Sequence, residues 1–200
     1  SKPDSGKIML YGKEIKESDN IPMVFQQYSS FEWMTVLENI ALPMKLAGID
    51  KKTREERARK IINLIGLDGS ENKYCSYGVL SGGMLQRASI GRALACDSKL
   101  LMLDEYSSGL DYFTKFELQD LLLKIFNNRD VDRTFLMVTH DISEAVYLSN
   151  RIYILEPKPC RIKEVIDIKF SQPRTQAIRE TDEFKDYYAK ALKALNETVK

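Results

Sequence analysis

The spacing of hydrophobic residues changes several times along the chain, and each change predicts a different element. Short apolar stretches at residues 8–11 and 21–26 are bounded by turn-forming residues, which is typical of strands. Further apolar runs occupy residues 100–103, 135–138 and 152–155, and segments with helical spacing separate them. Runs without alternation are typical of parallel strands buried on both faces. An alternating strand at residues 161–170 and a charged helix at residues 181–199 complete an α/β pattern.

A mostly helical block at residues 35–77 interrupts this succession of strands. Thr35 can cap its first helix, with Glu38 three residues later as the second member of a capping box. Pro43 is expected to kink or break that helix, because proline has no amide hydrogen to donate. A longer helix is predicted to open at Asp50 and to stop at Gly66.

Composition and charge exclude several classes of protein. Hydrophobic residues make up 44% and charged residues 30%, as in folded globular domains. The 30 basic and 29 acidic residues nearly cancel, so no overall field favours nucleic acid as a partner. No apolar run approaches the roughly 20 residues that cross a bilayer, and no signal peptide is evident. Cys75, Cys96 and Cys160 lack metal-ligand spacing and are expected to be reduced thiols, as in the cytosol.

Residues 80–87, Leu-Ser-Gly-Gly-Met-Leu-Gln-Arg, carry the strongest chemical signal. Ser81 suits an N-cap, and the residues that follow it favour a helix. Gly82 and Gly83 leave the amide groups of the first turn open to approach. Together with the helix dipole and the serine hydroxyl, these amides can bind an anion. The alternative is an ordinary helix start softened by glycine, and a Ser-Gly-Gly taken alone would favour it.

Two adjacent acids, Asp104 and Glu105, follow the apolar run 100–103. The carboxyl end of a parallel strand is where open α/β sheets bind ligands. Asp104 suits Mg²⁺, which prefers oxygen ligands, and Glu105 suits the activation of a water molecule. A helix cap beside a solvated acid is the alternative. Residues 107–111 then form a loop that can reach a neighbouring subunit.

His140, the only histidine, follows the apolar run 135–138. A single histidine is more often structural than catalytic. Its predicted place at the same sheet edge as Asp104 and Glu105 favours a functional role here.

In this order and spacing, these segments resemble the ATP-binding subunits of ABC transporters. Residues 80–87 resemble the family's signature sequence, residues 100–105 its Walker B strand and residues 107–111 its D-loop. Gln26 matches the Q-loop glutamine and His140 the switch histidine. Phe31-Glu32-Trp33-Met34-Thr35-Val36, Met84 and residues 144–148 and 156–161 resemble the nitrate, sulfonate and taurine importers within the family.

The resemblance implies an α/β, P-loop NTPase-like ABC ATPase fold. Residues 1–34 and 78–170 would form the ATPase core lobe, residues 35–77 a helical subdomain inserted between Q-loop and signature, and residues 171–200 a C-terminal helical extension. The implied function is coupling of ATP hydrolysis to uptake of a small anion such as nitrate, a sulfonate or taurine.

The resemblance also implies ATP and Mg²⁺ as cofactors, bound between two subunits arranged head to tail. Asp104 and Gln26 would hold the metal and Glu105 would be the general base. His140 and Gln26 would contact the γ-phosphate, the metal or the attacking water. The residues assigned to the nucleotide and the interface across the dimer are Ser81, Gly82, Gly83, Gln86 and Asp111.

The implied partners are a membrane permease, a second ATPase subunit and, indirectly, a solute-binding protein. The chain would then lie in the cytoplasm, peripheral on the inner face of the cell membrane. Tyr28, Phe31, Trp33 and Met34 are candidates for the groove that receives the permease. The alternative for these apolar residues is that they pack the two lobes together.

No Gly-x-x-x-x-Gly-Lys-Ser/Thr sequence, the phosphate-binding loop called Walker A, occurs in the 200 residues. We therefore expect an N-terminally truncated form of such a subunit that hydrolyses no ATP by itself. Without the strand that carries this loop, neighbouring strands should lack a partner and core surface should be uncovered. The alternative function is a non-hydrolysing partner, or an inactive truncated fragment, that supplies only the signature half of an ATP site.

Overall fold

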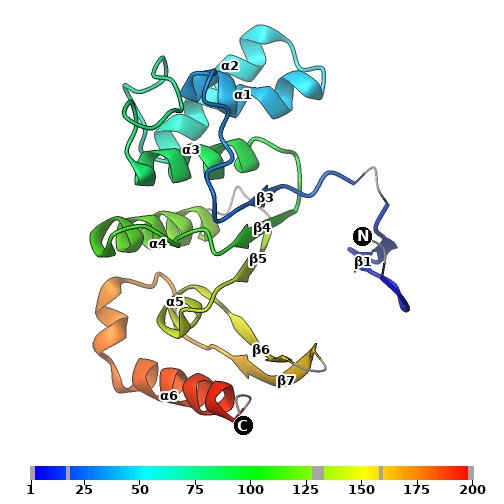
Figure 1. Ribbon diagram of the computed structural model, residues 1–200, viewed down its shortest axis with the longest axis vertical. Coiled ribbons are helices and arrows are strands. Elements are labelled where there is room, and N and C mark those ends of the chain that lie inside the picture. The colour runs from blue at the N-terminus through cyan, green and yellow to red at the C-terminus, as the bar shows by residue number, and fades with distance from the viewer. Residues whose placement is uncertain (1–2, 17–18, 128–132, 158–159, 198–200) are drawn as a thin grey trace.

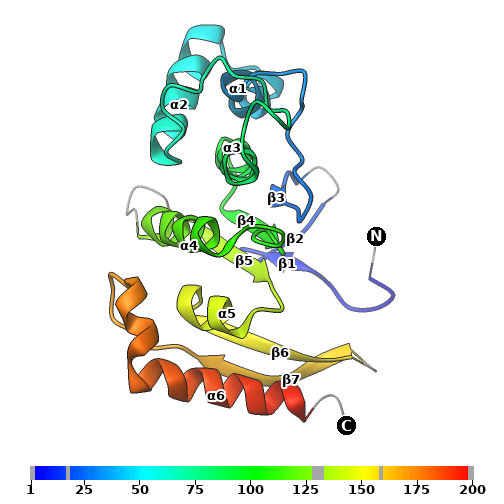
Figure 2. The same ribbon diagram turned by 60° about the vertical axis from the view of Figure 1, so that its left-hand side comes forward.

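The structure is a computed structural model, and it describes residues 3–16, 19–127, 133–157 and 160–197. Figures 1 and 2 show its elements in tiers along the long axis. Three helices form one end, a small parallel sheet with α4 lies in the middle, and a β-hairpin with α6 forms the other end. The N-terminal hairpin of β1 (Met9–Leu10) and β2 (Lys13–Glu14) lies to one side. The phenolic Oη of Tyr11, in its turn, donates to the carbonyl oxygen of Lys99 at 2.7 Å.

The helical end consists of α1 (Val36–Leu46), α2 (Lys51–Leu64) and α3 (Gly82–Leu94). The predicted capping box is confirmed: Thr35 accepts from the amide of Glu38, whose carboxylate accepts from the amide of Thr35. Asp50 caps α2 as predicted, and Gly66 follows the end of α2 with a φ of +67°. Helix α3 contacts both α1 and the sheet strand β3, so it joins the helical end to the middle tier.

The predicted break at Pro43 does not occur, because α1 continues through it to Leu46. Pro43 stands near the end of the helix, where its missing amide removes one hydrogen bond, to the carbonyl of Asn39. Its own carbonyl still accepts from the amide of Ala47 at 3.0 Å. A single lost backbone bond close to a helix end is evidently tolerated in this packing.

The middle sheet has three parallel strands in the order β3 (Met23–Val24), β4 (Leu100–Asp104) and β5 (Thr134–Val138). Two of the three apolar runs therefore pair as predicted. The third was wrongly predicted: β6 (Arg151–Pro157) pairs antiparallel with β7 (Cys160–Asp167) in a separate sheet. A run of apolar residues indicates burial, but it does not specify which strand will be the partner.

The parallel sheet is covered on only one face within the described residues. Leu101 and Leu103 of β4 are buried with α4 (Tyr112–Phe126) and the rest of the core. On the other face, Leu136 and Val138 are 47% and 55% exposed, and β5 pairs with β4 alone among the described strands. These exposed side chains fit the expectation of uncovered core surface. They also contradict the prediction that all parallel strands are buried on both faces.

The far end combines α5 (Ile142–Leu148), the β6–β7 hairpin, a 3₁₀ turn at Gln176–Glu180 and α6 (Asp182–Asn196). Figure 2 shows α6 running along the hairpin. Phe170 and Phe184 stack there with ring centroids 6.1 Å apart. The predicted terminal helix is confirmed from its Thr181 cap to Asn196, and its predicted end at Val199 lies outside the described residues. The division into core lobe, helical subdomain and C-terminal extension stays a prediction.

Candidate functional site

The carboxyl ends of β4 and β5 bring two predicted catalytic residues into contact. Asp104 ends β4, and Glu105 follows it. His140 lies two residues beyond the end of β5. The Glu105 carboxylate oxygen Oε1 is 3.3 Å from His140 Nδ1, across two strands that are neighbours in the sheet. The imidazole is largely exposed, with 74% of its side-chain surface accessible, so this pair is open to a ligand.

Glu105 has an unusual backbone conformation, with a φ of +43°. For a residue with a Cβ atom, the left-handed region costs about 1–2 kcal/mol, because Cβ lies too close to a carbonyl oxygen of the backbone. Two backbone bonds hold the turn: the Glu105 amide donates to the carbonyl of Val138 at 2.9 Å, and the Ser108 amide donates to the carbonyl of Glu105 at 2.9 Å. A strained backbone of this kind persists only where the surrounding structure maintains it, and such residues are common at functional sites.

Gln26 lies close to the same region, two residues after β3. Its side-chain Nε2 donates to Ser108 Oγ at 3.2 Å, which ties the Q-loop position to the loop after Glu105. Sequence analysis assigned no role to Ser108. Its place inside residues 107–111 is the only signal that could have indicated one.

No cluster of three or more His, Cys, Asp or Glu side chains suited to a metal ion occurs in the part of the chain that the structure describes. Mg²⁺ commonly uses only one or two protein ligands and completes its shell with water and phosphate oxygens. Asp104 directly precedes Glu105, Gln26 contacts Ser108 three residues after it, and both side chains carry an oxygen atom. This donor set is of the right chemistry for Mg²⁺ bound together with a nucleotide.

The predicted signature residues stand at the start of α3. Ser81 is its N-cap, and its Oγ accepts from the Met84 amide at 3.3 Å. Because a hydroxyl can accept and donate at once, the exposed Ser81 can still donate to an anion. Both glycines are closely packed: a Cβ on Gly83 would lie 2.4 Å from Thr114 Cγ2, and one on Gly82 would lie 2.6 Å from Oη at the end of the Tyr28 side chain.

Gln86 is not at the surface in this arrangement. Its side chain is fully buried, and its Nε2 donates to the carbonyl of Phe25 at 3.4 Å. Farther along the same helix, Arg92 donates to Ser29 Oγ at 2.7 Å. Gln86 therefore holds α3 against the segment that carries Gln26, and its assignment to the nucleotide stays a prediction.

Asp111 caps α4 and lies next to the signature turn through Thr114. Its carboxylate accepts from the Thr114 amide at 3.1 Å and from Thr114 Oγ1 at 2.5 Å. The hydrogen bond from the Thr114 hydroxyl, followed by those from backbone amides, lowers the pKa of Asp111. Thr114, which sequence analysis did not single out, thus bonds to Asp111, and its methyl group occupies the position beside Gly83.

The four candidates for a permease-binding groove differ in exposure, and their role stays a prediction. Trp33 is 71% exposed, and its ring lies 5.1 Å from that of Phe31. Met34 lines a groove of about 220 Å³ between α1 and α2. Tyr28 instead packs against Tyr77, at 5.5 Å between ring centroids.

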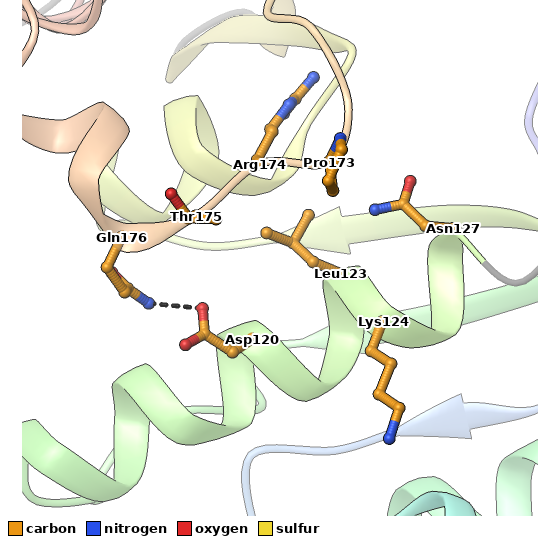
Figure 3. Close-up of a pocket in the computed structure, with 8 residues that line it drawn as sticks. All are labelled: Asp120, Leu123, Lys124, Asn127, Pro173, Arg174, Thr175 and Gln176. Carbon is orange, nitrogen blue, oxygen red and sulfur yellow. Dashed lines mark hydrogen bonds between the residues drawn. The ribbon is translucent and has the colours of Figure 1, made fainter.

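A second pocket, of about 400 Å³, lies between α4 and the segment before α6 (Figure 3). The Gln176 side chain donates to Asp120 Oδ1 across it at 2.7 Å. None of its lining residues is a predicted site residue.

Among the described residues, no helix is both long and apolar enough to cross a bilayer.

Comparison with known proteins places these motifs in one family. The sequence profile of the ABC transporter family matches residues 1–108 of this chain. An uncharacterized ABC transporter ATP-binding protein of Methanocaldococcus jannaschii is 42% identical over 198 residues, which are 98% of this chain and 72% of that protein. An aliphatic sulfonates import ATP-binding protein of Bacillus cereus is 39% identical over 188 residues, 94% of this chain and 71% of that protein.

Solved structures agree with this assignment. The dimeric structure of a bacterial ABC transporter cassette has a TM-score of 0.70 at 27% identity, covering 86% of this chain and 77% of that one. A post-hydrolysis state of an ATP-binding cassette bound to ADP and phosphate has a TM-score of 0.68 at 26% identity, with the same coverage. The resemblance recognised from the motifs is thereby confirmed, and the chain belongs to the ATP-binding subunits of the ABC transporter family.

Proposed function

We propose that this chain supplies the catalytic carboxylate and the histidine for ATP hydrolysis that drives import of a small anion. The observation that carries the proposal is the contact between Glu105 and His140 at the carboxyl ends of adjacent parallel strands. A carboxylate and an imidazole in contact, exposed beside an acid suited to Mg²⁺, are the groups that phosphoryl transfer to water requires.

In this proposal each side chain has a definite task. Oε1 of Glu105 is occupied by His140, whereas Oε2 accepts no hydrogen bond from the described residues and is free to accept the proton of an attacking water. His140 then fixes the orientation of that carboxylate. Asp104 and Gln26 would hold Mg²⁺, which neutralises phosphate charge when it is bound. Catalysis would rest on positioning and charge, as is usual for phosphoryl transfer.

The second half of each site would come from another subunit. The exposed hydroxyl of Ser81 and the amides beside Gly83 form an anion site at the start of α3. Family members of known structure dimerise, as the related bacterial cassette does. We propose a head-to-tail dimer in which Ser81, Gly82, Gly83 and Asp111 of one subunit face the nucleotide held by the other.

The solute and the location are also proposals. Relatives that import aliphatic sulfonates favour a sulfonate or a similar small anion, such as taurine or nitrate, as the cargo. The exposed Trp33 and the groove beside Met34 would receive a permease subunit, which would hold the chain at the inner face of the membrane. Comparing alkanesulfonate, taurine and nitrate as stimulants of ATP turnover in vesicles with the permease would identify the cargo.

A second function is favoured by one observation. The anion site at Ser81 is built entirely from the start of α3 and needs nothing from Glu105 or His140. The chain could therefore lend a signature half-site to a complete ATPase subunit without hydrolysing ATP itself. Stimulation of such a subunit by the chain, unchanged by Glu105→Gln but lost in Ser81→Ala, would identify this function.

The hydrolysis proposal is tested in a chain to which a segment carrying a Gly-x-x-x-x-Gly-Lys-Ser/Thr phosphate-binding loop has been added at the N-terminus. We expect the 200 residues alone to show no measurable turnover and the extended chain to hydrolyse Mg-ATP. Glu105→Gln should lower that turnover by about 10²–10⁴-fold, the usual contribution of a general base. Glu56→Gln, on the exposed face of α2, is the control and should have no effect. Normal turnover in Glu105→Gln would refute the assignment of the base.

A further inference from the structure

Glu144 in α5 is a fully buried acid that the proposed reaction does not use directly. Its Oε1 accepts from Tyr106 Oη at 2.9 Å, from Ser107 Oγ at 2.7 Å and from Gln119 Nε2 at 3.1 Å. Its Oε2 accepts from Thr139 Oγ1 at 2.7 Å. Four donors therefore converge on its two oxygens, both of which act as acceptors.

The sequence positions of these donors connect Glu144 to the candidate site. Tyr106 and Ser107 directly follow Glu105, and both are buried. Thr139 directly precedes His140. One carboxylate therefore joins the two loops that carry Glu105 and His140, whose side chains meet at 3.3 Å.

The left-handed backbone of Glu105 needs a restraint that this connection can provide. A left-handed residue other than glycine persists only where its surroundings restrain it. Burial and Glu144 together raise the pKa of the Tyr106 phenol well above its ordinary value, so Tyr106 stays protonated and keeps donating. The residues that follow Glu105 are thus fixed from one side by Glu144 and from the other by the packed core.

Gln119 links Glu144 to an arginine on the segment before α6. Gln119, which donates to Glu144, accepts through Oε1 from Arg179 Nη2 at 2.6 Å. Buried charged groups are usually no better for stability than well-packed apolar residues of similar size. A purely structural role would therefore not require a carboxylate whose donors flank both Glu105 and His140.

We propose that Glu144 is a positioning residue that sets the contact between Glu105 and His140. The importance of that contact for hydrolysis rests on the proposed function, but the contact itself can be measured without nucleotide. Because His140 is the only histidine, selectively labelled histidine gives one imidazole signal in an NMR spectrum of the full chain. Replacing Glu105 by Gln should shift this signal, since the two side chains touch.

The test compares that shift in two backgrounds. In Glu144→Gln one carboxylate oxygen is replaced by an amide nitrogen, which cannot accept, so the four donors share a single acceptor oxygen and the tie between the two loops should weaken. The response of the His140 signal to Glu105→Gln should then be largely lost. Thr139→Val and Ser107→Ala each remove one donor and should each reduce the response, which keeps the test possible if Glu144→Gln fails to fold. The control is Ile62→Val, a buried change in α2 that should lower stability without altering the response.

Each outcome is decisive. A full response in the Glu144→Gln background, or in both single-donor variants, would overturn the proposal. So would the absence of any response in the otherwise unchanged chain, because the contact would then not exist in solution. Failure of the proposed function has a different signature: the extended chain would not hydrolyse ATP although the coupling between Glu105, His140 and Glu144 remained intact.

Discussion

Replacing Gly83 by Ala tests how the signature turn is packed against α4. A Cβ at this position would lie 2.4 Å from Thr114 Cγ2, whereas ordinary carbon–carbon contacts are about 3.5–4.0 Å. The methyl of Thr114 cannot easily turn away. Its hydroxyl donates to Asp111 at 2.5 Å, so rotation about χ1 would break that hydrogen bond.

The expected magnitude follows from opposing terms. Overpacking by one methyl group costs about 1–3 kcal/mol, and replacing a helical glycine by alanine returns up to about 1 kcal/mol. Gly83→Ala should therefore lower the free energy of unfolding by roughly 1–2 kcal/mol, as the difference between these terms. Thr114→Ser deletes only the methyl that is in the way and keeps the bond to Asp111. Alone it should cost less than about 0.8 kcal/mol, the value of one buried methylene.

The double variant Gly83→Ala with Thr114→Ser tests whether the Thr114 methyl causes the destabilisation. With Cγ2 removed, Gly83→Ala should no longer be destabilising, so the two effects should fail to add by about 1–3 kcal/mol. Urea unfolding followed by far-UV ellipticity measures each free energy by linear extrapolation. Gly82→Ala is the matched control, because its new Cβ would meet the end of the Tyr28 side chain and Leu110 rather than Thr114, so Thr114→Ser should leave its effect unchanged. Additivity of the two changes within about 0.3–0.5 kcal/mol would refute the reasoning.

Three further predictions concern charge, thiols and a buried amide. The hydrogen bond from Thr114 lowers the pKa of Asp111, so its stabilising effect should be complete above the unfolded value of about 3.9 and be lost as pH falls through the lower folded value. The stability advantage over Asp111→Asn, measured by urea unfolding, should shrink as pH falls below about 3.9, and a constant advantage would contradict the prediction. Burial raises the pKa of Cys75 to about 11, so iodoacetamide should alkylate the exposed Cys160 first, and equal labelling rates in mass spectra would contradict this packing. Asn39→Ala removes four hydrogen bonds to the backbone before and at the start of α1. It should lower the free energy of unfolding by roughly 2–4 kcal/mol. A loss below about 1 kcal/mol would show that these bonds contribute little.

Features whose partners lie close in sequence could be predicted well. The capping box at Thr35 and the caps at Asp50 and Ser81 each use an amide three residues away. Such contacts form wherever the chain is helical, and distant segments have little influence on them. Pro43 shows the limit of local reasoning, because its effect depended on how much helix remained after it.

The motifs alone are sufficient to identify the family. Asp104, Glu105 and His140 each follow an apolar run, and parallel strands necessarily bring their carboxyl ends to one edge. Sequence could therefore predict that these residues lie near each other. It could not predict the left-handed backbone of Glu105 or the burial of Gln86, since both depend on packing between segments far apart in the chain.

By itself, the sequence determined the family, the helix starts and the two strands that end at the candidate site. Tertiary structure alone decided that β6 pairs with β7 rather than joining the parallel sheet, and that Glu144 binds donors from both loops of the site. The reason is the same in both cases. An apolar run or a single acid carries no information about its partner, and only the folded chain brings residues 25 to 40 positions apart within hydrogen-bonding distance.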